Sequence, residues 1–261
     1  MRLAEAVVLA DREALPGAWL LRLAAPGISA AARPGQLVLL RPESGPHPLL
    51  RPALTVHRLG RGEISFLFGA MDDGLRALAR CRPGDHLQVQ GPLGRGFAVS
   101  PSSRNLLLVG QGLGAAPLVA LAEWAVGAGL AVTLLAGAAG SADLLPASMI
   151  PAEVEYRVAT RDGSQGSQGS ALDLLAPARG TSPLLWADQV FAGGEPPFYL
   201  ALRDAVAAAR IRPEPGFAQG IVAGTLGCGM GACLGCAVET RRATVYLCKN
   251  GPVVDLDDML L

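Results

Sequence analysis

The sequence has little cysteine, almost no lysine and no excess of charge of either sign. Among its 261 residues are five cysteines, Lys249 as the only lysine, and 22 basic residues against 22 acidic ones. A chain with no net charge and no basic block lacks the feature that attracts nucleic acids or anionic membrane surfaces. No uncharged apolar run is long enough to cross a bilayer, and charges interrupt segment 1–15. We therefore expect a soluble cytoplasmic protein without nucleic-acid or membrane partners.

Histidine is scarce as well. His47, His57 and His86 are scattered through the first third of the chain, and no serine, cysteine or carboxylate pattern accompanies them. Hydrolytic triads need such a constellation, so this class of enzyme is disfavoured. We predict no catalytic acid–base residue in this chain.

The length suggests about two domains, with room for a small third one.

Four of the five cysteines gather near the C-terminus, in a spacing that indicates an iron–sulfur site. Cys228, Cys233, Cys236 and Cys248 follow C-x4-C-x2-C-x11-C, the plant-type arrangement that holds a 2Fe–2S cluster on four thiolates. Glycines between the first three cysteines remove bulk and allow the loop to turn around a cluster. A zinc site and a disulfide pair remain as alternatives, although zinc sites usually show two short cysteine pairs and cytosolic disulfides are rare.

The first hundred residues read as short strands between Pro-Gly breaks. The breaks are Pro16-Gly17, Pro26-Gly27, Pro34-Gly35 and Pro83-Gly84. The expected strands are 3–9, 19–23, 36–40, 53–59, 63–68 and 86–90, with one helix at 74–79. Breaks at hairpin-like intervals favour an antiparallel barrel or sandwich.

From residue 105 onward, apolar runs alternate with helical stretches. Strands are expected at 106–109, 132–135, 154–158 and 189–191, and helices at 118–126, 171–176 and 196–210. This alternation predicts a parallel sheet covered by helices. Gly110, Gly112 and Gly114 lie at a strand-to-helix turn, where a bare backbone can approach a pyrophosphate, although a plain tight turn is the alternative. Residues 162–170 suit a linker or a nucleotide-facing loop, and 212–216 suit a domain boundary.

Several motifs together carry a resemblance to a known family. They are Leu50-Arg51-Pro52, the Gly91 to Phe97 segment, the Gly110 to Pro117 turn, Gly193-Gly194-Glu195-Pro196, and the cysteine loop with its tail from Cys248 to Val253. The chain resembles, over essentially its whole length, the electron-transfer subunit of the NAD-dependent dihydroorotate dehydrogenases, which are ferredoxin-reductase-like flavoproteins. The resemblance implies a multidomain fold: an FAD-binding antiparallel β-barrel at 1–100, an NAD-binding α/β parallel-sheet domain at 101–212, and a small 2Fe–2S domain at 213–261.

The resemblance also implies cofactor contacts. Arg51 and Pro52 match the start of an R-P-x-S flavin motif, in which a planar guanidinium suits the FAD pyrophosphate. The implied contacts to FAD or to the nucleotide are Arg51, Pro52, Ala53, Leu54, Thr55, Phe68, Gly69, Gly74, Leu75, Gly110, Gly112 and Gly114.

The chain departs from the family pattern at four positions. Leu54 and Leu75 stand where the family has hydroxyl residues, Ala192 stands for a cysteine near the nicotinamide, and Ala223 stands for a glutamate before the cluster loop. We expect FAD to be retained, with looser binding or altered hydride chemistry.

The function that the resemblance implies is an electron relay in pyrimidine biosynthesis. A partner subunit carrying FMN would oxidise dihydroorotate to orotate, and electrons would pass through the 2Fe–2S cluster to FAD and on to NAD. The cluster should lie at the interface of a heterotetramer. One alternative is a subunit of a related NAD(P)H:ferredoxin or sulfide-linked reductase. The other is a cluster-bearing structural or regulatory partner without nicotinamide activity.

Overall fold

The structure is a computed structural model that describes residues 2–43, 50–176, 182–210 and 214–260. Contacts within the chain group it into two compact units. Unit 1 comprises Met1–Gly96 and Val222–Val253, and unit 2 comprises Phe97–Ile221 and Val254–Leu261. The cysteine loop therefore belongs to the same compact unit as the N-terminal strands. The division into domains at residues 100 and 212 stays a prediction, and residues 212 and 213 lie outside the described ranges.

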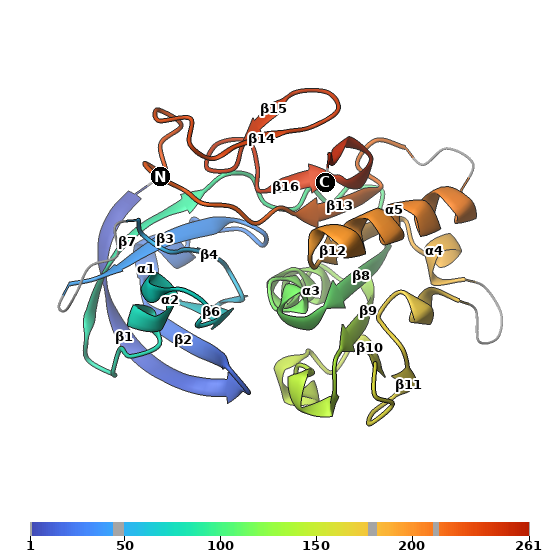
Figure 1. The fold of residues 1–261 in the computed structure, drawn as a ribbon, viewed down its shortest axis with the longest axis horizontal. Coiled ribbons are helices and arrows are strands. Elements are labelled where there is room, and N and C mark those ends of the chain that lie inside the picture. The colour runs from blue at the N-terminus through green and yellow to red at the C-terminus, as the bar shows by residue number, and fades with distance from the viewer. Residues whose placement is uncertain (1, 44–49, 177–181, 211–213, 261) are drawn as a thin grey trace. The chain divides into compact units, whose positions relative to one another are not determined.

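Unit 1 is built on an antiparallel sheet, as predicted. Its strands are β1 (Arg2–Leu15), β2 (Ala18–Ala24), β3 (Leu37–Pro42), β4 (Ala53–Thr55), β5 (Arg58–Leu59), β6 (Glu63–Gly69) and β7 (His86–Leu93). They pair in the order β4-β3-β7-β1-β2-β6-β5. Figure 1 shows the long β1 and β2 bending, so that the sheet curls. The unit also contains the helices α1 (Pro26–Ser29) and α2 (Asp73–Leu78) and the hairpin of β14 (Ala237–Glu239) and β15 (Thr244–Tyr246).

Two local expectations for this unit were wrong. Pro26-Gly27 does not break a hairpin but opens α1, because proline at the first helical turn loses no intrahelical hydrogen bond and already has a helical φ. The single strand expected at 53–59 is divided into β4 and β5, which pair with different strands, β3 and β6. By contrast, Gly17 and Gly84 turn the chain with φ of +70° and +95°, as Pro-Gly breaks require.

β1 carries a carboxyl group whose oxygens are shielded from water. Both carboxylate oxygens of Asp11 on β1 are buried and have no hydrogen-bond partner among the described residues. Burial raises the pKa of Asp11 from 3.8 to about 7 because a carboxylate loses solvation in such a place. The folded state therefore keeps a proton on Asp11 at pH values where the unfolded chain has released it.

The Asp11→Asn variant should remove a pH dependence of stability. Since the folded pKa is raised, the wild-type free energy of unfolding should fall as pH rises from about 4 to about 7 and then level off. For a half-buried group we expect a loss of about 2 kcal/mol across this window, absent in the variant. Urea unfolding at pH 5 and pH 8 measures it. Parallel pH curves for both proteins would contradict the assignment.

Unit 2 contains the predicted parallel sheet. Its strands are β8 (Asn105–Gln111), β9 (Ala131–Ala138), β10 (Glu155–Thr160), β11 (Ser167–Gln168), β12 (Gln189–Gly193), β13 (Ala218–Ile221) and β16 (Val253–Asp255). They pair in the order β11-β10-β9-β8-β12-β13-β16. The strand order reverses between β8 and β12, which are parallel neighbours: β9, β10 and β11 follow on one side of β8, whereas β12 and β13 lie on the other side. Open α/β sheets bind ligands at such a switch point, beyond the carboxyl ends of the strands.

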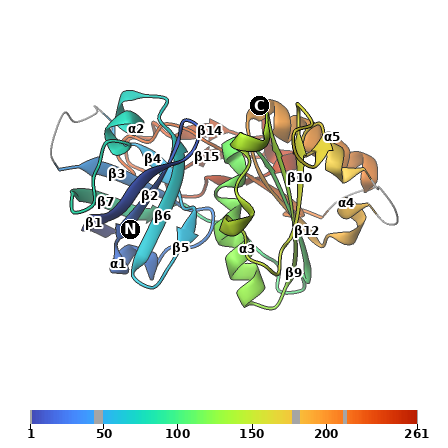
Figure 2. The same cartoon turned by 90° about the horizontal axis from the view of Figure 1, so that it is seen from below.

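Helices cover both faces of this sheet. Figure 2 shows α3 (Leu118–Gly127) on one face and α4 (Pro183–Trp186) with α5 (Pro196–Ala209) on the other. The short helices of this unit are η1 (Gly112–Ala115), η2 (Ser141–Asp143), η3 (Ala147–Met149), η4 (Asp173–Leu175) and η5 (Leu256–Asp258). The helix expected at 171–176 is thus only the single turn η4. No helix in the described ranges has the length and apolar character that a membrane span needs.

Candidate functional site

The four clustered cysteines form two pairs of thiols in unit 1, Cys236 with Cys248 and Cys228 with Cys233, and the side chains of each pair are hydrogen-bonded to each other. The Sγ atoms of Cys236 and Cys248 lie 3.4 Å apart, and both residues are buried. The N–H groups of Met230 and Cys233 point at Cys228 Sγ, at 3.3 and 3.4 Å. No three of these sulfurs, all within the described ranges, lie within 4.8 Å of one another. Two pairs of thiols suit a cluster of two irons held by four thiolates.

The loop that carries the first three cysteines is shaped by residues without bulk. Gly229 and Gly231 have φ of +67° and +75°, a conformation that side chains rarely adopt. A Cβ on Gly227 would lie 3.1 Å from Cys233 Sγ, and a Cβ on Gly235 would lie 3.6 Å from the same atom. The small residues therefore keep the space around this sulfur open.

Cys248 is held by the motif around Gly94. The N–H of Gly94 donates to the Cys248 carbonyl at 3.0 Å, and the N–H of Leu247 donates to the Cys236 carbonyl at 3.1 Å. A Cβ on Gly94 would overlap the Gly251 carbonyl oxygen, so two motifs of the family resemblance meet here backbone to backbone. The glycine segment at 91–97 thus supports the last cysteine.

The half-buried Cys228 and the buried Cys248 differ in acidity. Backbone N–H groups of Cys233 and Met230 lower the pKa of Cys228 to about 6, since they stabilise the thiolate. Burial, together with the neighbouring Cys236, raises the pKa of Cys248 to about 11. Cys228 is thus easily deprotonated to a thiolate, whereas the thiolate of Cys248 needs a bound metal to stabilise it. The donor set fits the predicted cluster.

Five of the predicted flavin contacts line one pocket of about 460 Å³. They are Arg51, Pro52, Ala53, Gly74 and Leu75, and the pocket is completed by Leu50, Asp72, Asp73, Gly224, Thr225 and Leu226. The last three precede the cysteine loop. A second pocket of about 430 Å³ shares Leu50 and Arg51 and is also lined by Cys228. The structure therefore brings the flavin motif next to the cysteine loop within unit 1.

The start of α2 makes a weak phosphate site. The N–H of Leu75 already donates to the Asp72 carboxylate at 2.8 Å, so this helix end is capped by its own side chain. A Cβ on Gly74 would lie 2.8 Å from Pro52 Cγ, which shows that glycine is needed here for packing. A hydrogen bond from Arg76 lowers the pKa of Asp73, so a second negative charge remains. The guanidinium of Arg51 is consequently the group of this pocket that fits a diphosphate.

The other predicted flavin contacts lie elsewhere. Leu54 and Phe68 are buried in the core of the sheet, and Thr55 and Gly69 are half-buried. None of the four lines the two pockets described above. Their contact with a flavin stays a prediction.

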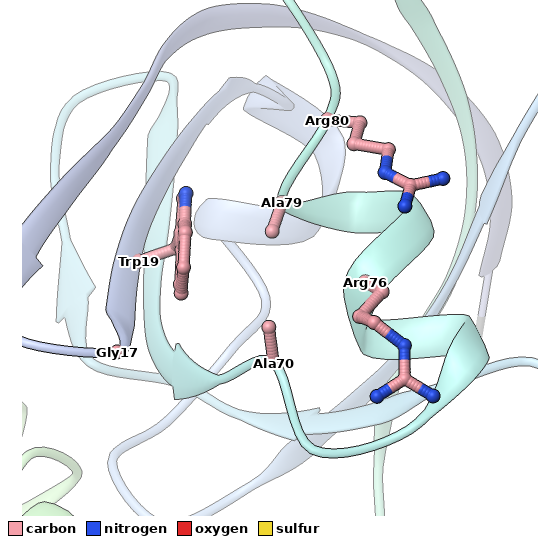
Figure 3. Close-up of a pocket in the computed structure, with 6 residues that line it drawn as sticks. All are labelled: Gly17, Trp19, Ala70, Arg76, Ala79 and Arg80. Carbon is pink, nitrogen blue, oxygen red and sulfur yellow. The ribbon is translucent and has the colours of Figure 1, made fainter.

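A further pocket of about 350 Å³ follows the end of β6. Figure 3 shows the ring of Trp19 facing Ala70 and Ala79, whereas the guanidinium groups of Arg76 and Arg80 point away from the ring. Arg76 donates to Asp73 at 2.8 Å. Among the described residues that line this pocket, those nearest the Trp19 ring are thus apolar, and the two arginines are directed away from it.

The glycine turn of unit 2 lies where two backbones touch. A Cβ on Gly110 would lie 2.5 Å from the Cα of Ala115, and a Cβ on Gly114 would overlap the backbone of Gly193. The turn that contains Gly110 and Gly114 and the backbone at Gly193 both lie at the switch point between β8 and β12, where a nucleotide is expected. Close packing by itself explains Gly110 and Gly114, whereas a Cβ on Gly112 would meet open space. Ala192 is fully buried in β12.

The Gly114→Ala variant should destabilise unit 2 by about 3 kcal/mol, because a methyl group cannot fit against the Gly193 backbone. The control is Gly127→Ala at the end of α3, where a Cβ meets nothing within 4 Å and alanine favours the helix. Chemical unfolding compares the two. Equal stability of both variants would show that the backbone contact does not constrain this turn.

One residue between the flavin motif and the cysteine loop of unit 1 was missed by sequence reasoning. Gln90 on β7 is 7% exposed and contacts both Arg51 and the cysteine loop. Gln90 follows His86 and Gln88 in the alternation of polar and apolar residues along β7 (His86–Leu93), so the sequence does not single it out or identify its partners.

The sequence is similar to that of known electron transfer subunits. Residues 224–260 match the family model described as the iron–sulfur cluster binding domain of dihydroorotate dehydrogenase B. The chain is 30% identical over 258 residues to the dihydroorotate dehydrogenase B (NAD(+)) electron transfer subunit of Desulforamulus reducens, with 95% of both chains covered. It is 31% identical over 235 residues to the subunit of the same name from Geobacillus thermodenitrificans, with 87% of both chains covered.

Solved structures share the fold. The NADH-dependent reduced ferredoxin-NADP oxidoreductase matches with a TM-score of 0.80 and 22% identity, covering 98% of this chain and 89% of that one. The ferredoxin reductase of a carbazole 1,9a-dioxygenase matches with a TM-score of 0.66 and 21% identity, covering 80% of this chain and 66% of that one. These matches confirm the predicted ferredoxin-reductase-like fold.

Proposed function

This chain belongs to the family of dihydroorotate dehydrogenase B electron transfer subunits, and we propose that it relays electrons from an FMN-containing catalytic subunit to NAD in pyrimidine biosynthesis. Its cofactors are a 2Fe–2S cluster, FAD and NAD. The observation that carries the proposal is the paired thiols of the cysteine loop beside the pocket of the flavin motif. The chain is an oxidoreductase subunit, and dihydroorotate is oxidised in its partner.

The electron balance needs both kinds of cofactor. Dihydroorotate loses two electrons and two protons in becoming orotate, and NAD takes up two electrons and one proton. When bound, the cluster supplies one-electron transfer and FAD supplies conversion to hydride chemistry. We assign Cys228, Cys233, Cys236 and Cys248 as ligands of the cluster. Arg51 would hold the FAD diphosphate, and N–H groups of the loop stabilise the sulfur of Cys228.

The partner's place follows from the exposed apolar residues of unit 1. Leu3, Leu50 and Met230 are 69%, 45% and 61% exposed, and all three line the pocket that contains Cys228. Exposed apolar side chains next to a redox site favour docking of the catalytic subunit there. The proposal includes a heterotetramer with the cluster at its interface. It also includes a cytoplasmic location, where the five free thiols stay reduced.

The test is an absorption spectrum of anaerobically purified protein before and after NADH, with iron and flavin quantified. Flavin and cluster bands should both be present, and NADH should bleach both. A protein with the cluster band but no flavin would instead be the cluster-bearing structural partner. A protein with neither band would refute the relay.

A further inference from the structure

A single amide joins the flavin motif to the cysteine loop. Gln90 Oε1 accepts a hydrogen bond from Arg51 Nη1 at 2.8 Å, and Gln90 Nε2 donates to the carbonyl oxygen of Cys228 at 2.9 Å. The side chain is buried, with 7% of the residue exposed. Buried hydrogen bonds of this kind are costly to break, because water cannot replace the lost partner.

The two partners determine the orientation of the amide. A guanidinium can only donate and a backbone carbonyl can only accept, so Gln90 must direct its oxygen at Arg51 and its nitrogen at Cys228. A reversed amide would satisfy neither group. Of the residues that are similar in size to glutamine, glutamate offers acceptors only and leucine offers neither function. The bridge therefore needs an amide at this position.

The loop is shaped to receive this side chain. A Cβ on Gly229 would lie 2.7 Å from Gln90 Nε2, and Gly229 has φ of +67°. The residue after Cys228 thus leaves room for the amide. Arg51 lines both neighbouring pockets, the one with Gly74 and the one with Cys228. Gln90 lines the pocket with Cys228.

We propose that Gln90 is a positioning residue that orients Arg51 toward the flavin diphosphate and anchors the cysteine loop at Cys228, so that flavin binding and the cluster environment are coupled. The inference rests on the proposed cofactor assignment and deepens it. Because coupling between two sites is reciprocal, occupancy of the flavin site should change the surroundings of the cluster, and the change should depend on this amide.

The test compares Gln90→Leu with wild type as full-length, cluster-loaded protein. Titration of flavin-depleted protein with FAD should give a dissociation constant about tenfold higher in the variant, since a charge-assisted hydrogen bond that orients Arg51 is lost. The electron paramagnetic resonance spectrum of the reduced cluster should differ between flavin-depleted and FAD-loaded wild type. In Gln90→Leu this difference should be absent.

Two further variants complete the design. Gln88 lies on the same strand, two residues before Gln90, so Gln88→Leu is the matched control. This variant should keep wild-type FAD affinity and the FAD-dependent spectral difference. Gln90→Glu keeps the shape and the Arg51 contact but faces the Cys228 carbonyl with an acceptor. It should therefore lose the spectral difference even if Gln90→Leu does not fold.

The outcomes separate the inference from the function. A spectral difference that persists in Gln90→Glu, or an unchanged FAD affinity in a folded Gln90→Leu, would overturn the coupling and leave the relay intact. Wild-type protein without a cluster signal or without FAD binding would overturn the proposed function and this inference with it.

Discussion

Replacement of Cys228 by alanine is expected to abolish the 2Fe–2S cluster. The purified variant should contain less than about a tenth of the iron of wild type and should lack the visible cluster bands. The cluster needs four thiolate ligands, and the variant offers only three. N–H groups of the loop lower the pKa of Cys228 to about 6. Its loss also removes the acceptor of those N–H groups. Iron analysis and absorption spectra measure the effect.

The matched control is the fifth cysteine. Cys81 is half-buried outside the loop, and burial together with nearby Asp11 raises its pKa to about 11. Cys81→Ala should therefore keep full iron content. Wild-type iron in Cys228→Ala, or loss of iron in Cys81→Ala, would contradict the ligand assignment.

Replacement of Arg51 by alanine is expected to weaken FAD binding by about a hundredfold. The guanidinium is the cationic group in the pocket with Gly74 and Leu75, whereas Asp72 and Asp73 carry negative charge there. Losing charge-assisted hydrogen bonds to a diphosphate costs about 3 kcal/mol, which is a factor of about a hundred in affinity. FAD titration of flavin-depleted protein, followed by flavin fluorescence, gives the dissociation constants.

Arg22→Ala is the control for charge. Arg22 is half-exposed on β2 and pairs with Glu63 at 3.4 Å, so its removal should change neither FAD affinity nor stability by more than about 0.5 kcal/mol. Equal FAD affinity in Arg51→Ala and wild type would place the diphosphate elsewhere.

The sequence was most informative where function depends on short-range spacing. The cysteine loop could be recognised because three of its ligands lie within nine residues of one another. The alternation of strands and helices in unit 2 likewise predicted a parallel sheet, because its longer elements, such as β8, β9 and α5, are long enough to show their period. Turns at Gly17 and Gly84 followed from local chemistry alone.

Long-range contacts could not be predicted in this way. Gln90 is 39 residues from Arg51 and 138 residues from Cys228, and no local pattern marks either pairing. The grouping of 222–253 with the N-terminal strands depends equally on distant contacts, so chain order suggested a separate segment. That Leu54 and Leu75 weaken flavin binding stays a prediction, because backbone N–H groups can bind the phosphates in place of the missing side-chain hydroxyls.

The central claim is that electrons reach NAD through the cluster of this chain. The most direct measurement is made on the anaerobic complex of this chain with its FMN-containing catalytic subunit. Dihydroorotate added without NAD should produce the electron paramagnetic resonance signal of the reduced cluster, and NAD should then remove the signal as NADH forms. With Cys228→Ala in the complex, dihydroorotate should yield no NADH. NADH formation at the wild-type rate in that complex would contradict the relay.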